Sequence, residues 1–369
     1  MFPVDVTIAI ITFNALETHL PRAIAAALNA GCSPGQLLVI DVASTDGTAI
    51  YLRRHYPHLS LITLAENRGP NPARNRALLE APTPYVLVMD VDVELLPGVA
   101  DRMRDLLHDD PMIGVATPVV VYSDRPDIIN YARTWLHFLG EASATHQDQP
   151  TATLGDGPCD VGACTGCAPM IRRSAAIEIG LFDERLFFGK TDGDFAYRMT
   201  IAGYRIVELS DARVLHHRQQ RGSKFFDHQI ANRWYFLLKN YQWRTLVLCA
   251  PALAVHEVAL LLFLAAKGGL IWWWRGLTRF VGLCPALPAA RAQTRRVRRI
   301  DDAYLLQGSN LVTPIPHQSR GILARMLRVY ESAMSVYWSA IGTLLRGFRP
   351  GTGAGARGKR GREPAIRLG

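Results

Sequence analysis

Two carboxylates stand directly after an apolar run, in the segment YVLVMDVDVEL at residues 85–95. Asp90 and Asp92 are separated by one residue, and carboxylate oxygens are ligands that Mg²⁺ and Mn²⁺ favour in proteins. A cation held this way keeps positions for substrate phosphates and neutralises a departing diphosphate. A solvated strand end with a capping role would look the same, because Asp-x-Asp pairs are common. The pair therefore indicates phosphate chemistry only in the company of other polar residues.

A parallel α/β sheet is predicted to position this pair. Apolar, β-branched runs predict buried strands at 4–12, 37–41, 59–64 and 85–89. Helical patterns between them predict helices at about 16–30 and 48–55, and a loop followed by a helix within 67–81. This alternation with short links is typical of a doubly wound, Rossmann-like and mostly parallel sheet flanked by helices. Such sheets bind ligands at the carboxyl ends of their strands, where Asp41, Asp90 and Asp92 fall.

The chain between residues 113 and 209 is less regular. Further strands are predicted at 113–121 and 203–209, around a long irregular stretch rich in Gly, Asp and Cys. Three cysteines of that stretch lie within nine residues: Cys159, Cys164 and Cys167. Zinc would need a fourth ligand, for which His146 is the candidate. Packing or loop cysteines are the preferred interpretation.

Five segments in order carry a resemblance to a known family. They are IAIITFN (8–14), VIDVASTDGT (39–48), NRGPNPARNRA (67–77), MDVDVEL (89–95), and an acceptor-side half at 165–199 and 203–217. Together they resemble the inverting glycosyltransferases of family 2, which have the GT-A fold, and within it a rhamnosyltransferase-like subgroup. The resemblance covers about residues 4–223. It implies transfer of a sugar from a nucleotide-sugar donor to a lipid-linked glycan or polysaccharide acceptor.

The resemblance implies a donor side made of polar residues in the first half. Asp41 matches the carboxylate that contacts the nucleotide base, and Arg74 matches an Arg near the diphosphate, where a guanidinium fork suits phosphate oxygens. Asp90 would lie near the ribose or the metal. Val42 departs from the family, which has Asn after that Asp. The full set of expected donor-binding residues is Thr12, Asn14, Asp41, Asp46, Arg74 and Asp90.

The resemblance also implies a metal site and a general base. Asp92 would be the direct ligand of Mg²⁺ or Mn²⁺, completed by His216. In KTDGDF, Asp192 aligns with the catalytic Asp of the family's G-E-D-x-D-L, and Thr191 replaces the usual Glu. A carboxylate in that place takes the proton of the attacking acceptor hydroxyl. An acceptor loop is expected at Gly166, Cys167 and Asp194, with a helix N-cap as the alternative role of Asp194.

Positive charge gathers in the last third of the chain. The whole chain carries 41 Lys and Arg against 32 Asp and Glu, a net of +9; residues 245–369 carry 18 against 5, a net of +13. Residues 245–266 are apolar and long enough to span a bilayer. His256, Glu257 and Pro251 within them are costly in lipid. We therefore expect helices that lie at an anionic membrane surface, with a single span as the alternative.

Three regions are expected along the chain. They are a catalytic GT-A domain at 1–244, a helical membrane-associating region at 245–345 and a disordered, Gly- and Arg-rich tail at 346–369. The N-terminus has no basic region and cleavage site typical of a signal peptide, and six Cys form no disulfide framework at this length. The expected location is the cytoplasmic face of the cell membrane.

Other functions are weighed against this interpretation. A sugar-phosphate nucleotidyltransferase would carry a Gly-rich, Lys-bearing loop after its first strand, where Thr12-Phe13-Asn14 stands. A degenerate scaffold or binding protein would lack Asp92 or Asp192. The tail has no interleaved aromatics for nucleic-acid binding, which is not expected. Processive synthases use Q-x-x-R-W, whereas Gln229 and Arg233 have three residues between them.

Overall fold

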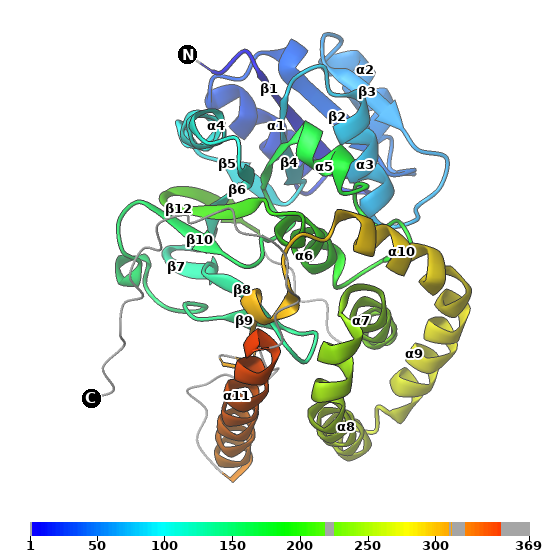
Figure 1. Ribbon diagram of the computed structural model, residues 1–369. Coiled ribbons are helices and arrows are strands. Elements are labelled where there is room, and N and C mark those ends of the chain that lie inside the picture. The colour runs from blue at the N-terminus through cyan, green and yellow to red at the C-terminus, as the bar shows by residue number, and fades with distance from the viewer. Residues whose placement is uncertain (1, 218–224, 310, 312–321, 348–369) are drawn as a thin grey trace.

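The structure is a computed structural model that describes residues 2–217, 225–309, 311 and 322–347. The predicted disordered tail lies almost wholly outside these residues. Strands and helices alternate through the first ninety residues, as predicted (Figure 1). The parallel strands are β1 (Val6–Thr12), β2 (Leu37–Asp41), β3 (Ser60–Thr63) and β4 (Tyr85–Asp90). The helices between them are α1 (Leu20–Asn29), α2 (Thr48–His55) and α3 (Pro70–Glu80).

The first four strands pair in the order β4-β1-β2-β3, all parallel. Every residue of β1 is buried, because helices cover both faces of the sheet. The register sets Thr12 beside Asp41 and Ile11 beside Asp90. The carboxyl ends of β1, β2 and β4 therefore meet at one edge, which confirms the predicted arrangement.

The second half of the sheet is mixed, not parallel throughout. Its strands are β5 (Val93–Leu95), β6 (Ile113–Tyr122), β7 (Arg125–Tyr131), β10 (Pro158–Val161), β11 (Met170–Arg172) and β12 (Arg205–His216). The short β11 runs antiparallel to both β4 and β6, and β6 pairs in parallel with β12. Strand β12 continues past the predicted end at 209 because a register shift between Leu209 and Arg213 lets it keep pairing with β6.

The stretch predicted to be irregular carries regular elements, so that prediction is wrong. Besides β7, β10 and β11 it holds β8 (Thr134–His137), β9 (Ala142–Ala144), α5 (Arg173–Glu178) and α6 (Thr191–Ile201). Most of these elements are three to seven residues long, too short to produce a clear apolar period. Helix α4 (Val99–Asp109) was also not predicted. Strand β8 joins β9 and β13 (Leu306–Gln307) in a separate three-stranded sheet.

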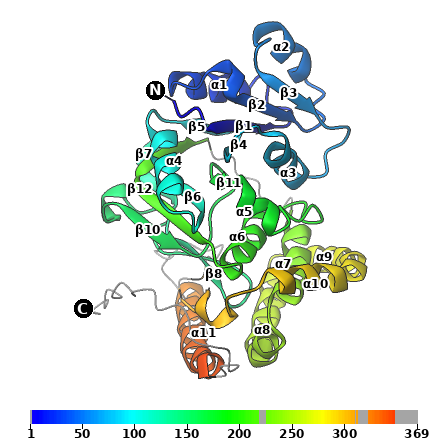
Figure 2. The same cartoon turned by 45° about the horizontal axis from the view of Figure 1, so that its top comes forward.

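Five helices form the end of the molecule opposite β1–β3 (Figures 1 and 2). They are α7 (Phe226–Asn240), α8 (Trp243–Ala266), α9 (Leu270–Leu283), α10 (Leu287–Val297) and α11 (Ile322–Gly347). Helices α9 and α10 pack on α7, and α11 packs along α8. The apolar run at 245–266 is thus helical within α8, and the region expected to be helical at 245–345 ends in the long helix α11.

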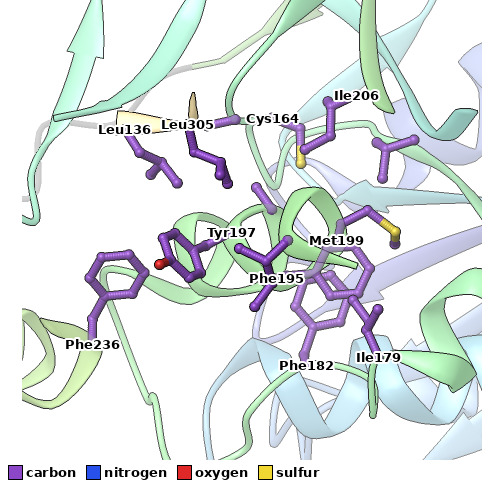
Figure 3. Packing of buried hydrophobic residues seen from close by; sticks show 14 of the residues in the cluster. Leu136, Cys164, Ile179, Phe182, Phe195, Tyr197, Met199, Ile206, Phe236 and Leu305 are labelled. Carbon is purple, nitrogen blue, oxygen red and sulfur yellow. The ribbon is translucent and has the colours of Figure 1, made fainter. Parts of the chain in front are cut away.

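One hydrophobic core joins the sheet to these helices. Figure 3 shows Phe182 and Phe195 packed together, and their rings stack at 4.0 Å. Tyr197 contacts Phe236 of α7, edge to face. Burying an aromatic side chain contributes about 1.5–3 kcal/mol, so these contacts hold α6 firmly between sheet and helices. The same cluster includes Ala252 of α8, so core packing is continuous across residue 244.

A buried carboxyl on β12 makes stability depend on pH. Glu208 is 4% exposed, accepts a hydrogen bond from the Arg133 N–H at 2.8 Å and lies 3.4 Å from its guanidinium. Burial raises the pKa of Glu208 to about 7, although Arg133 opposes the shift. The folded protein therefore keeps a proton that the unfolded chain has lost. Stability from this group is present below about pH 4.5 and is lost as pH rises through 7.

We predict that Glu208→Gln removes this loss. Between about pH 5 and pH 8, the free energy of unfolding of wild type should fall by about 2–3 kcal/mol because of this carboxyl. In Glu208→Gln this fall should be absent. Urea denaturation at the two pH values measures it, with Glu80→Gln on the exposed face of α3 as the control. An unchanged pH dependence in Glu208→Gln would show that the buried carboxyl does not hold its proton.

Candidate active site

Arg74 of α3 is the centre of a polar site at the carboxyl end of β4. Its guanidinium donates to Asp192 Oδ1 at 3.0 Å and to Asp90 Oδ1 at 3.2 Å. It also donates to the Gly166 carbonyl oxygen at 3.3 Å. The Arg74 side chain is 4% exposed, whereas the two carboxylates are about one-third exposed. One buried cation therefore holds two carboxylates that face solvent, and residues 74, 90, 166 and 192 are brought together.

Asp192 is the second residue of α6, which begins at Thr191 directly after Lys190, a residue with the left-handed φ of 61°. Besides Arg74, two donors hold its carboxylate: the Gly166 N–H at 2.9 Å and the Thr191 hydroxyl at 2.5 Å. Thr191, where the resembling family has Glu, thus supports Asp192 by a hydrogen bond. These contacts fix the direction of the carboxylate and leave it accessible to a substrate hydroxyl.

Gly166 approaches this pair so closely that no side chain fits. A Cβ at residue 166 would lie 2.2 Å from Arg74 Nη2 and 2.9 Å from Asp192 Oδ1. Both of those groups are held by other contacts and have little freedom to move. A glycine is therefore required here by the close approach of backbone to the Arg74–Asp192 pair.

We predict that Gly166→Ala lowers turnover by about a hundredfold. The methyl group must displace Arg74 or Asp192, and an ångström of misplacement at a reacting group costs on the order of that factor. Steady-state turnover measures the effect, and thermal unfolding checks that the variant folds. Gly155→Ala is the matched control, because its Cβ would meet nothing within 4 Å. Wild-type turnover in Gly166→Ala would contradict this geometry.

Asp90 lies close to two other carboxylates, Asp92 and Asp192. Burial raises its pKa to about 6, the charges of Asp92 and Asp192 raise it too, and Arg74 lowers it. Ionised carboxylates this close repel one another unless a cation lies between them. Arg74 supplies one positive charge, which leaves the site electrostatically suited to a further cation.

Two buried polar atoms lie unpaired at the neighbouring strand ends. Asp41 Oδ2 and Thr12 Oγ1 have no hydrogen-bond partner within the described chain, and both side chains are buried. The other Asp41 oxygen accepts from the Ser44 N–H at 3.1 Å. Orphaned buried polar atoms are rare in folded proteins and mark strained or ligand-binding places. Thr12 and Asp41 thus sit side by side at the edge where a donor was expected.

Asn14 and Asp46 shape the loops that surround this edge. Asn14 has a positive φ of 46°, and its side-chain oxygen accepts from the Thr45 N–H at 2.8 Å. Asp46 accepts from the Leu16 N–H at 2.9 Å and from Thr48. Burial alone would raise the pKa of Asp46, but these hydrogen bonds lower it. Both residues join the loop after β1 to the loop after β2.

Asp92 and His216 are adjacent, as the metal-site prediction requires. His216 Nε2 lies 3.5 Å from Asp92 Oδ2, and both side chains are largely buried. The other ring nitrogen, Nδ1, is hydrogen-bonded to Asn130 Oδ1 at 2.7 Å, which orients the ring. Asn130 was not predicted, because it lies on β7 in a stretch without a clear period. Among the described residues, no ready-made group of three His, Cys, Asp or Glu ligands occurs.

Asp194 does not lie at an acceptor surface, and the alternative role as a helix cap is also wrong. Its side chain is fully buried and makes no capping hydrogen bond. It pairs instead with Lys239 at 2.8 Å and Arg198 at 2.9 Å, and accepts from Asn240 at 2.8 Å. The reason is helical geometry: two residues after Asp192, the chain has turned toward the protein interior. The partners on α7 leave no mark in the sequence pattern.

Cys167 lies under the site and not in it. Its carbonyl oxygen accepts from the Asp90 N–H at 2.9 Å, which ties the acceptor-side loop to β4. Cys164 and Cys167 are both buried, and among the described residues no group of three His, Cys, Asp or Glu side chains is placed to hold a metal ion. Cys164 and Cys167 therefore pack in the core, whereas Cys159 is partly exposed on β10; packing or loop cysteines were the interpretation preferred from the sequence.

Comparisons with known proteins agree with this geometry. Residues 7–180 match the model of glycosyl transferase family 2. The chain is 29% identical over 221 residues to an N-acetylglucosaminyl-diphospho-decaprenol L-rhamnosyltransferase of Mycobacterium tuberculosis. The aligned region covers 54% of this chain and 72% of that protein. It is 38% identical over 111 residues to the succinoglycan biosynthesis protein ExoU of Rhizobium meliloti, 29% of this chain and 31% of that protein.

A solved structure has the same fold. GalNAc-T7, crystallised with UDP, GalNAc and Mn²⁺, aligns with a TM-score of 0.53 at 15% identity, over 64% of this chain and 48% of that one. At this identity the likeness bears on the fold alone. It agrees with a GT-A-like α/β sheet that continues into further helices here.

Proposed function

This chain belongs to glycosyltransferase family 2, and from that premise we propose that it transfers a sugar from a nucleotide-sugar donor to a lipid-linked glycan or polysaccharide in cell-envelope assembly. The name of the mycobacterial relative specifies a lipid-diphosphate acceptor, and that of the Rhizobium relative a polysaccharide. The observation that carries the proposal is the position of the buried Arg74. Its guanidinium pairs both with Asp90, where the donor is expected, and with Asp192, where the acceptor is expected.

The proposed reaction is one displacement at the anomeric carbon, with inversion. The acceptor hydroxyl oxygen forms the new bond to that carbon while the bond to the diphosphate oxygen breaks. Asp192 takes the hydroxyl proton, since a carboxylate within hydrogen-bond reach of an attacking hydroxyl serves as general base. Its three donors hold it in one direction, which supplies the positioning that such a step requires.

The donor would lie along the carboxyl ends of β1, β2 and β4. The unpaired Asp41 Oδ2 and Thr12 Oγ1 suit the polar edge of a nucleotide base or ribose. Arg74 lies between Asp90 and Asp192, where its charge would face the diphosphate. Asn14 and Asp46 would act through the shape of the loops that enclose the donor.

The residues around Asp92 fit a divalent metal. A metal-bound His commonly has its second ring nitrogen held by an oxygen, as Asn130 holds His216. Asp92 and His216 would hold Mg²⁺ or Mn²⁺ with Asp90 nearby, and diphosphate oxygens would complete the coordination. When bound, the ion supplies charge that stabilises the departing diphosphate.

We predict that Asp92→Asn abolishes the metal-dependent part of donor binding. An amide oxygen is a much weaker ligand for a hard cation than a carboxylate, so Mn²⁺ should no longer strengthen nucleotide affinity. Calorimetry of UDP and dTDP, with and without Mn²⁺, measures this. The control is Asp124→Asn, whose side chain is exposed beside Arg125. Unchanged affinity in Asp92→Asn would remove this residue from the metal site.

A membrane surface is the proposed location of the enzyme. Within the described residues one helix, α8, is long and apolar enough to cross a bilayer, and 17% of its most apolar window is buried. Exposed apolar side chains also occur on α9 and α11: Ile271, Trp274, Val281, Met326, Val329 and Val336. Together these helices present an apolar surface suited to the boundary of a bilayer.

The polar residues of α8 favour lying at the surface over spanning it. His256 Nδ1 is hydrogen-bonded to the Tyr330 hydroxyl at 2.7 Å. Glu257 accepts from the indole N–H groups of Trp234 at 3.0 Å and Trp273 at 2.7 Å, and pairs with Arg233. The polar side chains in the middle of α8 therefore have hydrogen-bond partners within the protein, on one face of the helix. This agrees with a monotopic helix docked on α7, α9 and α11.

Turnover of a panel of nucleotide sugars tests the proposed function. Full-length protein is incubated with each donor, a lipid-diphosphate sugar and Mn²⁺, and released nucleotide is measured. Acceptor-dependent release with one donor supports sugar transfer. Release of pyrophosphate from a nucleoside triphosphate and a sugar phosphate instead would make the chain a nucleotidyltransferase. Binding of donor with no turnover on any acceptor would favour the scaffold alternative.

A further inference from the structure

A pocket of about 270 Å³ lies away from the active site, where α7 ends, α8 begins and α10 passes. Four of the side chains that line it are cationic: Lys239, Arg291, Arg295 and Arg298. None of its lining residues is Asp or Glu. A concave site with this lining attracts anions.

Two of the four cations are neutralised and two are not. Lys239 pairs with the buried Asp183 and Asp194, and Arg298 pairs with Asp302 at 2.6 Å. In the part of the chain that the structure describes, no carboxylate lies within ion-pairing distance of Arg291 or Arg295. The pocket therefore carries uncompensated positive charge.

Arg291 lacks a partner for part of its guanidinium. Its Nε is buried with no hydrogen-bond acceptor among the described residues, while Nη1 donates to the Leu238 carbonyl oxygen. Burial lowers the pKa of Arg291, and the charges of Arg298 and Arg295 lower it further. An anion in the pocket would relieve this repulsion and would offer an acceptor near Nε.

The start of α8 adds to the positive field of the pocket and carries an exposed tryptophan. This helix begins at Trp243 without a side-chain cap, so its first backbone N–H groups lack that acceptor. The Trp243 side chain is 64% exposed, and the Arg291 guanidinium lies 4.3 Å from the centre of its ring. Exposed Trp residues at the end of an apolar helix are typical of the headgroup level of a bilayer.

We propose that this pocket binds a phosphate group, presented by the headgroup of an anionic lipid at the membrane surface. Guanidinium groups bind phosphate oxygens through paired N–H donors, and a helix N-terminus adds to such a site. The lipid source rests on the proposed membrane location, whereas phosphate binding itself and its measurement do not depend on sugar transfer.

Full-length protein with Arg291→Gln and Arg295→Gln together tests the pocket. The matched control is Arg53→Gln with Arg54→Gln, which removes the same charge from the exposed end of α2. One arm measures sedimentation with phosphatidylcholine vesicles, with and without phosphatidylglycerol. The other measures thermal unfolding in inorganic phosphate against chloride at equal ionic strength. Thermal unfolding in chloride alone shows whether the double variant is folded. If it is not, the single variant Arg295→Gln, at an exposed position, replaces it in both arms.

The double variant should bind phosphatidylglycerol vesicles about tenfold or more less tightly than wild type, with the control within about twofold. Weaker binding of the double variant to phosphatidylglycerol vesicles would support an anionic lipid headgroup as the source of the phosphate. Loss of stabilisation by inorganic phosphate, with vesicle binding unchanged, would support the phosphate site and overturn its lipid source. If the double variant matches the control in both arms, the proposal is overturned. Turnover measured on the same samples reports on sugar transfer separately.

Discussion

Asp192→Asn should lower turnover at least about a hundredfold while donor affinity stays within a few-fold. General-base contributions are typically 10²–10⁴-fold, and the proton leaves the acceptor only as the new bond forms. An interaction made only in the transition state changes turnover and not ground-state binding. The structure favours an effect on turnover alone, because Asn keeps the size of Asp and its one oxygen can still accept hydrogen bonds from Arg74 and Thr191, as Asp192 Oδ1 does.

Steady-state kinetics and calorimetry on the same protein measure the two quantities. Asp124→Asn serves as the control, since it removes a carboxylate that is 75% exposed and pairs only with its neighbour Arg125 among the residues described. Turnover in Asp192→Asn within about tenfold of wild type would exclude this residue as the base. A large loss of donor affinity in place of turnover would move Asp192 to the donor side.

Asp194→Asn should have the largest effect on stability, about 3–5 kcal/mol. Removing one partner of a buried ion pair leaves the other charge uncompensated in a site that water does not reach. Asp194 is fully buried, and Lys239 and Arg198 are 3% and 2% exposed. Burial alone would raise the pKa of Asp194, but Lys239 and Arg198 lower it, so this carboxyl is ionised in the folded protein at neutral pH.

Urea denaturation at neutral pH measures that loss. The Asp124→Asn variant should differ from wild type by less than about 0.5 kcal/mol, as exposed substitutions usually do. Asp194 lies two residues from Asp192 in the same helical turn. Comparison of the two Asn variants therefore separates the structural role expected of Asp194 from the catalytic role expected of Asp192. Wild-type stability in Asp194→Asn, with turnover lost, would mean that residue 194 acts in the chemistry.

The donor half of the site could be predicted from the sequence because its signals are local. Each parallel strand is a continuous apolar run that ends in a polar residue, so Asp41 and Asp90 fall at the sheet edge by pattern alone. Arg74 and Asp192 are 118 residues apart, and only the family resemblance related them before the structure did.

The acceptor half depends on contacts that no local pattern reports. Strand β11 has three residues and no period, yet it links the parallel half of the sheet to β6. The buried role of Asp194 depends on Lys239 and Asn240, which lie on α7, 45 and 46 residues further along the chain. Glu257 looked costly in an apolar helix, and its partners Arg233 and Trp273 lie on other helices.

The anomeric configuration of the product tests most directly whether Asp192 and Arg74 serve a single displacement. Full-length protein is supplied with its turned-over nucleotide sugar and acceptor, and the new glycosidic bond is examined by proton NMR before it can be modified. One displacement with Asp192 as base predicts a product whose configuration is inverted relative to the donor. A product of retained configuration would contradict this mechanism, because it requires a second displacement or a different attack that this arrangement of carboxylates does not provide.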